Sequence, residues 1–167
     1  MDLSQTDLEL LAAELGRQLL ARGWMLATAE SCTGGWAAQA ITAIPGSSAW
    51  FDRGFVTYSN TAKMEMLGVS KTTLDQLGAV SEGTAREMAE GALHQSHAKA
   101  AFAITGIAGP TGGSDSKPVG TVCFAWTVLG QVSETEAAHF DGDRRLVRIQ
   151  AVEYVLRKML EALGPVQ

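Results

Sequence analysis

Hydrophobic residues recur along the chain with two periods, one typical of helices and one typical of buried strands. In the first segment the leucines at positions 8, 11, 15, 19 and 20 are spaced three and four residues apart, and Gly23 follows them. Together with a capping box at Thr6-x-x-Glu9, this spacing predicts a helix whose leucines face inward. Short apolar runs over residues 24–29 and 100–105 predict buried strands, and the Phe, Val, Thr and Tyr content of residues 51–59 predicts another strand.

Three helices are predicted around the second strand. A helix over residues 34–44 is ended by Pro45-Gly46, and two short helices over residues 61–67 and 71–77 are separated by a glycine. The first of these helices follows the first strand after a few residues. The stretch between them is therefore a strand-to-helix turn.

The second half of the chain continues the alternation. Ser81 begins a helix with apolar residues at positions 85, 88, 89, 92 and 93. Residues 119–129 and 132–140 predict an antiparallel hairpin. A last amphipathic helix over residues 144–163 is capped by Asp141 or Asp143, and its inward positions are 146, 149, 152, 156, 159 and 163.

Alternating helices and strands with short connections indicate an α/β protein. We expect a three-layer α/β/α sandwich with a mixed, mostly parallel sheet, the hairpin at one edge, and a single domain over residues 1–167. In such folds ligands bind beyond the carboxyl ends of the parallel strands. Three loops meet this condition, at residues 30–35, 58–63 and 105–113.

Composition narrows the class of protein. A net charge of −5 argues against broad contacts with nucleic acid, and no apolar block is long enough to span a membrane. The acidic start and the presence of only two cysteines favour the cytoplasm. No His, Cys or carboxylate cluster has metal-ligand spacing, so we expect neither a metal nor a cofactor.

The first loop, T-A-E-S-C-T-G-G over residues 28–35, places a hydroxyl beside a thiol. Ser31 at a strand end can act as a nucleophile next to free N–H groups, or Ser31 or Thr33 can cap the following helix. Cys32 as the nucleophile requires an adjacent histidine, and His94, His97 and His139 are not placed to serve as a base.

Lysine is the other base that a serine can use, once burial removes its proton. Lys63 directly follows the second strand and, on the predicted sheet, lies at the same edge as Ser31. It is either this base or a solvated helix residue. Tyr58 is close enough in the chain to hydrogen-bond the pair, or it is a core tyrosine at a strand end.

The third loop, T-G-I-A-G-P-T-G-G, lacks the Lys-Ser/Thr of a P-loop. It is either a flexible turn or a cradle for a phosphate or ribose, formed by Thr105, Gly106, Ala108 and Gly109. Arg144, Arg145 and Arg148 at the start of the last helix can supply a cation, and periodicity does not distinguish them.

Six motifs in order, T-A-E-S-C-T-G-G, I-P-G-S-S-A-W-F-D-R-G-F-V-T-Y-S-N-x-A-K, G-A-V-S-E, T-G-I-A-G-P-T-G-G, K-P-V-G-T-V and G-D-R-x-x-V-R, resemble the CinA C-terminal domain family. The resemblance covers nearly the whole chain. It implies hydrolysis of β-nicotinamide mononucleotide (NMN) to nicotinic acid mononucleotide and ammonia, a three-layer fold with a mixed sheet, and a homodimer.

The resemblance also assigns roles. It implies that Ser31 is the nucleophile and Lys63 its base, and it favours Arg145 as the cation, through its place in G-D-R-x-x-V-R. We expect the backbone N–H groups of Thr33, Gly34 and Gly35 to hold the oxyanion. A thiol hydrolase using Cys32 and a non-catalytic nucleotide-binding module are the alternatives.

Overall fold

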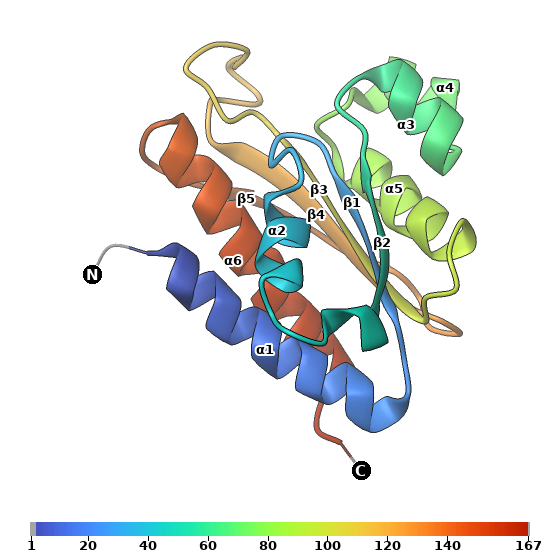
Figure 1. Cartoon of the computed structure of the whole chain (residues 1–167). Coiled ribbons are helices and arrows are strands. Elements are labelled where there is room, and N and C mark those ends of the chain that lie inside the picture. Colours follow the sequence, from blue (N-terminus) through green and yellow to red (C-terminus); the bar gives the residue numbers. More distant parts are fainter. Residues whose placement is uncertain (1–2, 167) are drawn as a thin grey trace.

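The computed structural model describes residues 3–166, and its centre is a five-stranded mixed sheet (Figure 1). The strand order is β2-β1-β3-β4-β5. β1 is parallel to β2 and β3, whereas β4 is antiparallel to both β3 and β5, so four strands share one direction. The strands are Leu26–Glu30 (β1), Phe51–Val56 (β2), Ala100–Gly106 (β3), Thr121–Val128 (β4) and Glu134–His139 (β5).

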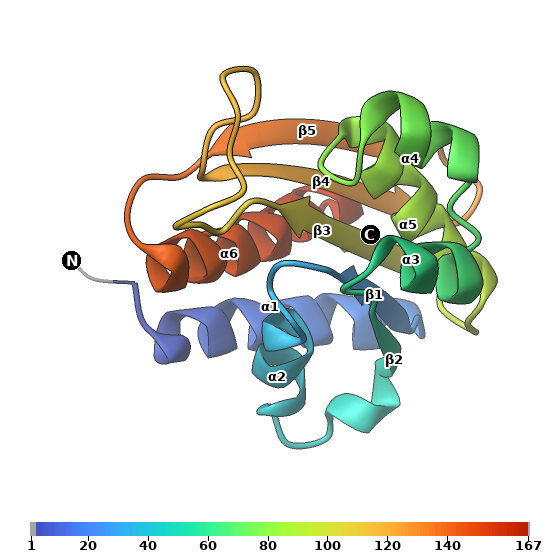
Figure 2. The same cartoon turned by 90° about the horizontal axis from the view of Figure 1, so that it is seen from above.

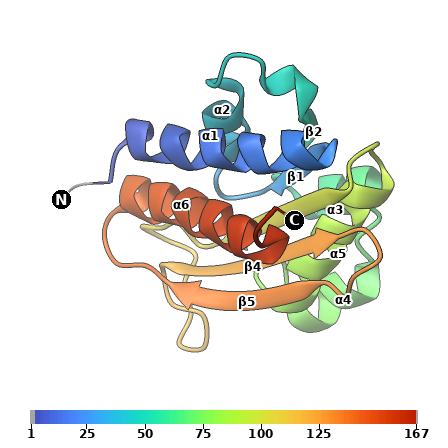
Figure 3. The same ribbon diagram turned by 90° about the horizontal axis from the view of Figure 1, so that it is seen from below.

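Helices cover both faces of this sheet (Figures 2 and 3). One face carries α1, α2 and α6, with α1 and α6 side by side, and the other carries α3, α4 and α5. The helices are Gln5–Arg22 (α1), Trp36–Thr42 (α2), Asn60–Leu67 (α3), Lys71–Leu77 (α4), Glu82–His94 (α5) and Arg144–Leu163 (α6), with a 3-10 turn at Ser47–Ala49. The predicted α/β/α sandwich is confirmed.

The two faces of the sheet differ in side-chain size. Phe102 and Ile104 of β3 and Phe124 of β4 face the α1 and α6 side, where the larger core lies. The alternate positions, which face α5, are mostly alanine and include Ala101 and Ala103. Successive side chains of a strand point to opposite faces, so α5 packs close to the strands while bulkier residues fill the opposite layer.

Most helices begin at a side chain that accepts a hydrogen bond from the first turn. These caps are Ser4, Ser59, Ser70, Ser81 and Asp143. The first helix therefore begins with a Ser4-Asp7 capping box, and the predicted box at Thr6 and Glu9 is wrong. The sequence did not decide between Asp141 and Asp143 as the cap of the last helix, and the structure shows that Asp143 is the cap.

Two predicted core positions are exposed instead. Leu20 of α1 has an exposed fraction of 53% and Leu146 of α6 one of 40%. The inward stripes run through Ala12 and Val147, each of which is fully buried. Each residue turns a helix by about 100°, so a leucine adjacent to the stripe can point outward. Element types were predicted correctly, although β2 ends at Val56 and not at residue 59.

The three predicted loops lie at the same edge of the sheet (Figure 1). They follow β1, β2 and β3, which are parallel and adjacent, so their carboxyl ends meet there. The 105–113 loop leads on to β4, and the N-terminus of α6 lies beside it.

Gly91 of α5 sets how closely that helix approaches α3. A Cβ at Gly91 would overlap the backbone carbonyl of Leu67, whereas a Cβ at Gly83 of the same helix would overlap only the flexible end of the Leu77 side chain. We expect Gly91→Ala to lower the free energy of unfolding by about 1–3 kcal/mol, since overpacking against backbone outweighs the better helix propensity of alanine. Urea denaturation measures this change.

Gly83→Ala is the matched control, because the Leu77 side chain can move aside. It should leave the free energy of unfolding within about 0.5 kcal/mol of the parent. Equal effects of the two substitutions would contradict the close approach of α5 to α3.

Candidate active site

Ser31 is the first residue after β1, and its backbone is fixed by the neighbouring strand. Its N–H donates to the Ile104 carbonyl of β3 at 2.9 Å. The turn that follows ends with Gly34 and Gly35, which have φ values of 61° and 102°. Only glycine adopts two such left-handed conformations in succession without strain, so the two glycines allow the chain to enter α2 directly after Ser31.

The first turn of α2 is held by Glu30, not by a hydroxyl. Glu30 is buried, and its carboxylate accepts from the N–H groups of Ala37 at 2.9 Å and Ala38 at 3.1 Å and from the hydroxyl of Thr33 at 2.6 Å. A negative charge at a helix N-terminus satisfies free N–H groups and interacts favourably with the helix dipole. The interpretation of Ser31 or Thr33 as the cap is therefore wrong, and the Ser31 hydroxyl is free for another role.

Lys63 of α3 contacts that hydroxyl. Its Nζ donates to Ser31 Oγ at 2.9 Å and to the Thr57 carbonyl at 2.9 Å. The exposed fraction is 1% for Lys63 and 8% for Ser31. Burial lowers the pKa of Lys63, because the ammonium form loses its hydration. Its interpretation as a solvated helix lysine is wrong.

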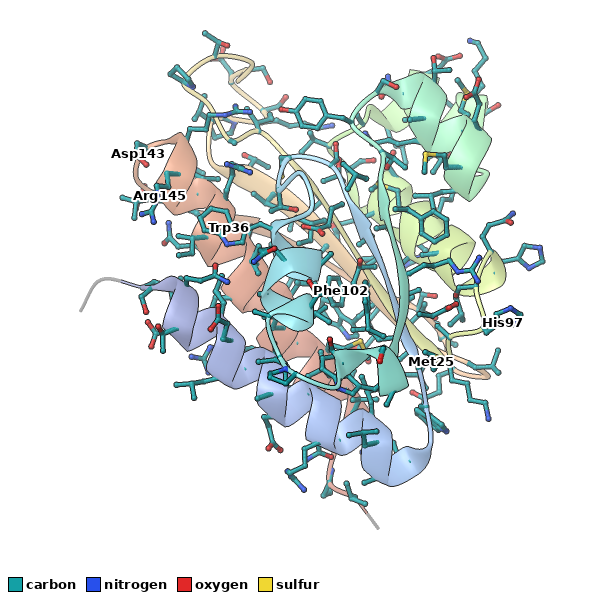
Figure 4. All side chains as sticks on the ribbon, viewed as in Figure 1. Met25, Trp36, His97, Phe102, Asp143 and Arg145 are labelled. Carbon is teal, nitrogen blue, oxygen red and sulfur yellow. The ribbon has the colours of Figure 1, made fainter. Side chains whose placement is uncertain are left out.

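The thiol next to Ser31 is less suited to be a nucleophile. Burial, reinforced by the charge of Glu30, raises the pKa of Cys32 to about 12. A thiol in such a setting carries almost no thiolate at neutral pH. His94, His97 and His139 are all exposed, and Figure 4 places His97 at the opposite end of the molecule from Trp36 and Arg145.

A pocket of about 210 Å³ opens onto the serine and the lysine. All three loops contribute to its wall, and Arg144 of α6 lies on its rim. The lining residues are Ser31, Cys32, Tyr58, Asn60, Lys63, Ala79, Val80, Thr105, Gly106, Ala108 and Arg144. The structure thus brings Ser31, Lys63, Tyr58 and the start of the glycine loop together at one site.

Tyr58 is not a core residue, since 62% of it is exposed. Its hydroxyl accepts from Arg144 Nη2 at 2.9 Å, and Arg144 Nη1 donates to the Gly109 carbonyl at 2.7 Å. Arg144 therefore links the loop after β2 to the loop after β3 across the rim of the pocket. Tyr58 bonds neither Ser31 nor Lys63 in this arrangement.

A larger cavity of about 790 Å³ adjoins the first and shares Ala108 and Arg144 with it. Trp36, Arg145 and Arg148 also line it, and Figure 4 shows Trp36, Arg145 and Asp143 together at the N-terminal end of α6. The guanidinium groups of Arg145 and Arg148 lie 5.9 Å and 5.3 Å from the centre of the Trp36 ring. This cavity is cationic and has an aromatic wall.

The glycine loop can offer backbone N–H groups to a ligand, but not the hydroxyl of Thr105. Thr105 is buried, and its hydroxyl donates to the Ala79 carbonyl at 2.8 Å, which removes it as a donor to a ligand. Gly106 packs against Val122 of β4. Within residues 3–166, no hydrogen bond uses the N–H groups of Ala108 and Gly109, so these two donors remain available.

The Ser31 turn leaves three of its own N–H groups free. Gly34 N–H donates to the Ser31 carbonyl at 3.0 Å, so it is not available to an oxyanion. In the part of the chain that the structure covers, the N–H groups of Cys32, Thr33 and Gly35 have no partner. Of the three N–H groups expected to bind the oxyanion, those of Thr33, Gly34 and Gly35, the one of Gly34 is therefore not available.

Residues 3–166 contain no group of three or more His, Cys, Asp or Glu side chains arranged to hold a metal ion. None of the helices in this range has the length and apolar character needed to cross a membrane.

Sequence reasoning did not single out Glu30. Periodicity did not separate the three arginines, and the resemblance favoured Arg145. Arg144 reaches the small pocket, Arg148 reaches the Ser31 turn, and Arg145 lines only the larger cavity. The signal for Glu30 is present in the sequence, because an acidic residue shortly before a helix that has a glycine at its N-cap can supply the missing cap.

Comparisons with known proteins place this chain in a family. The CinA C-terminal domain model matches residues 8–163. The chain is 54% identical to the nicotinamide-nucleotide amidohydrolase PncC of Enterobacter agglomerans, covering 95% of this chain and 96% of that protein. It is 55% identical to the protein of that name from Escherichia coli strain K12, with 92% and 94% covered.

A solved structure agrees with these matches. The competence/damage inducible protein CihA from Agrobacterium tumefaciens superposes with a TM-score of 0.92 at 48% identity, covering 99% of this chain and 100% of that one. Fold, sequence and family model thus point the same way, and the chain belongs to the CinA C-terminal domain family.

Proposed function

We propose that this protein is a nicotinamide-nucleotide amidase that hydrolyses the carboxamide of NMN to nicotinic acid mononucleotide and ammonia. The observation that carries the proposal is the 2.9 Å contact between a buried lysine and a serine at the end of a parallel strand. The names of the relatives, nicotinamide-nucleotide amidohydrolases, support the same substrate class.

In the first half of the reaction, neutral Lys63 accepts the proton of Ser31 as Oγ attacks the carboxamide carbon. The lowered pKa of Lys63 supports this role, because a base must be unprotonated at the working pH. The carbonyl oxygen becomes an oxyanion, and the free N–H groups of Cys32, Thr33 and Gly35 are the donors nearest to Ser31 in the chain. Lys63 then returns the proton to the departing ammonia, leaving an ester on Ser31.

In the second half, water attacks this ester. Lys63 accepts a proton from the water and gives it back to Ser31 Oγ as nicotinic acid mononucleotide leaves. The chain's own groups are enough for every proton transfer, so the proposal includes neither a metal nor a cofactor.

The two adjoining cavities suit the two parts of the substrate. The small pocket holds the serine and the lysine and accepts the carboxamide. The larger cavity, with Arg144, Arg145 and the free N–H groups of Ala108 and Gly109 near it, accepts the ribose phosphate. Trp36 offers a flat apolar wall beside Arg145 and Arg148.

We further propose that the enzyme is a homodimer in the cytoplasm. The resemblance to the family supports the dimer. Both cysteines of the described chain are free thiols, as is usual in a reducing compartment.

Replacing the nucleophile should abolish turnover without loss of the fold. We expect Ser31→Ala to lower kcat for ammonia release from NMN by about 10³-fold or more while leaving the affinity for NMN within a few fold, since a nucleophile acts mainly in the transition state. The neighbouring Cys32→Ala variant is the control and should remain active. A folded Ser31→Ala protein with the parent's rate, or an inactive folded Cys32→Ala protein, would contradict the assignment.

Lys63 should set the pH dependence. Activity requires the neutral amine, so kcat/KM should rise with pH along a limb governed by the pKa of Lys63, which burial lowers from its usual value. Lys63→Arg should be inactive, because guanidinium keeps its proton at any working pH. Ammonia release measured against pH checks both. An active Lys63→Arg enzyme would show that Ser31 uses another base.

The ribose phosphate of NMN should contribute strongly to kcat/KM. We expect kcat/KM for free nicotinamide to be at least about 100-fold below that for NMN, because hydrogen bonds to a charged phosphate contribute about 1.5–3 kcal/mol each. Arg144→Gln should raise KM for NMN and leave KM for nicotinamide unchanged, so that the values of kcat/KM for the two compounds come closer together. Equal kcat/KM for the two compounds would remove the anion site from the larger cavity.

A further inference from the structure

Asn60 is a polar residue of the small pocket whose side chain has no hydrogen-bond partner. It is exposed and lines the pocket, and within residues 3–166 no hydrogen bond uses its side-chain amide. The other hydroxyl, amine and guanidinium groups of the pocket all have partners: Ser31 with Lys63, Tyr58 with Arg144, and Thr105 with the Ala79 carbonyl. A side-chain amide donates through its nitrogen and accepts at its oxygen, so Asn60 can offer both kinds of bond to a ligand.

The start of α3 does not need the Asn60 side chain. Asparagine is common as an N-cap, but here Ser59 is the cap, and its hydroxyl accepts from the Ala62 N–H at 3.0 Å. Asparagine also has a lower helix propensity than alanine. Neither capping nor helix formation therefore explains an asparagine at this position.

Asn60 lies one helical turn from Lys63. Residues three apart on a helix share a face, with Cβ atoms about 5–6 Å apart, and both of these residues line the same pocket. Lys63 is buried and contacts Ser31 Oγ at 2.9 Å, whereas Asn60 is exposed to solvent. A group that reacts at Ser31 and receives a proton from Lys63 thus lies beside the face of α3 that carries Asn60.

A primary carboxamide differs from the carboxylate that its hydrolysis leaves, because only the carboxamide carries N–H donors. Among the described residues, no Asp or Glu side chain lines the small pocket to accept from them. The oxygen of Asn60 is an acceptor with both lone pairs free. It can accept from a carboxamide nitrogen, whereas a carboxylate has no proton to give it.

We propose that Asn60 is a specificity-determining residue, whose side-chain oxygen accepts a hydrogen bond from the carboxamide nitrogen of the substrate. The inference rests on the proposed amidase function. The bond selects the amide over the carboxylate product, since a carboxylate oxygen in the same place would face the Asn60 oxygen with no proton between them. It also holds the nitrogen in place for the proton that Lys63 delivers as ammonia leaves.

Binding of substrate and product to a protein without the nucleophile tests this selection. Adding Asn60→Ala to the Ser31→Ala protein should raise the Kd for NMN about tenfold, as loss of one good hydrogen bond does. The Kd for nicotinic acid mononucleotide should change by less than about threefold. Calorimetry measures both. Thr61→Ala, an exposed neighbour outside the pocket lining, is the control and should change neither. Equal changes for the two nucleotides, or no change for NMN, would overturn the proposal.

An ester tests the same bond during the reaction. The methyl ester of nicotinic acid mononucleotide carries an oxygen where NMN carries its NH2 group, and attack by Ser31 gives the same acyl-enzyme with methanol as the leaving group. We expect Asn60→Ala to lower kcat/KM for NMN at least about tenfold and kcat/KM for the ester by less than about threefold. Equal losses on the amide and the ester, in a protein with native circular dichroism, would overturn the proposal.

Asn60→Asp keeps the acceptor and adds a negative charge. The alkaline limb of kcat/KM for NMN should move to higher pH, because a carboxylate near Lys63 favours its ammonium form. The other titratable groups that line the pocket, Cys32, Tyr58 and Arg144, are the same in both proteins, so the shift would come from the new carboxylate. An unshifted limb would place the side chain at position 60 too far from the reacting groups and overturn the proposal.

The inference and the amidase function fail in different ways. If the parent releases no ammonia from NMN, the amidase function is refuted, and the binding comparison in the Ser31→Ala protein still decides the role of Asn60. If Asn60→Ala releases ammonia as fast as an active parent does, the role of Asn60 is refuted and the amidase function stands. Absence of NMN binding to both the parent and the Ser31→Ala protein refutes both.

Discussion

The site depends on the pairing of β1, in parallel, with a strand on each side. Glu30 at the end of β1 lies in register with Val56 of β2 and Ile104 of β3. The ladder continues one step further, since Ser31 N–H donates to Ile104 and Thr57 N–H donates to the Glu30 carbonyl. The carbonyl of Thr57 then accepts from Lys63. Two backbone hydrogen bonds and the bond from the Lys63 side chain thus connect the nucleophile to its base.

Alternation along β1 explains how a carboxylate and a reactive lysine can be neighbours in this small space. Successive residues of an extended chain point to opposite faces, so Glu30 turns toward α2 while Ser31 turns toward Lys63. Glu30 is occupied by three donors at the start of α2, and both partners of Lys63 are neutral oxygen atoms. A carboxylate beside Lys63 would favour its ammonium form and work against the burial that lowers its pKa.

The hydrophobic periods of the sequence were enough to predict the fold class and the element types, and they placed Ser31 and Lys63 at the same edge of the sheet. The assignment of Lys63 as the base of Ser31 came from the resemblance to the family, and the structure shows the two side chains in contact. The periods were not enough to choose among the arginines of α6. Their spacing places them on neighbouring faces of one helical turn, and which of them reaches a carbonyl depends on the distance to a turn more than one hundred residues earlier. The errors at Leu20 and Leu146 have a related cause, since hydrophobicity alone does not say which side of a stripe meets the neighbouring helix.

The first turns of α6 conflict with local helix preferences. Arg144, Arg145 and Arg148 lie near its N-terminus, where the helix dipole disfavours cations by about 0.3–1 kcal/mol each, and no acidic residue occupies the first turn. The cap Asp143 and the carbonyls of Gly109, Cys32 and Thr33 offset part of that cost. Local rules are broken in this way most often at functional sites. The chain has a net charge of −5, yet three arginines line the cavity beside the serine. This is where we propose that the phosphate of the substrate binds.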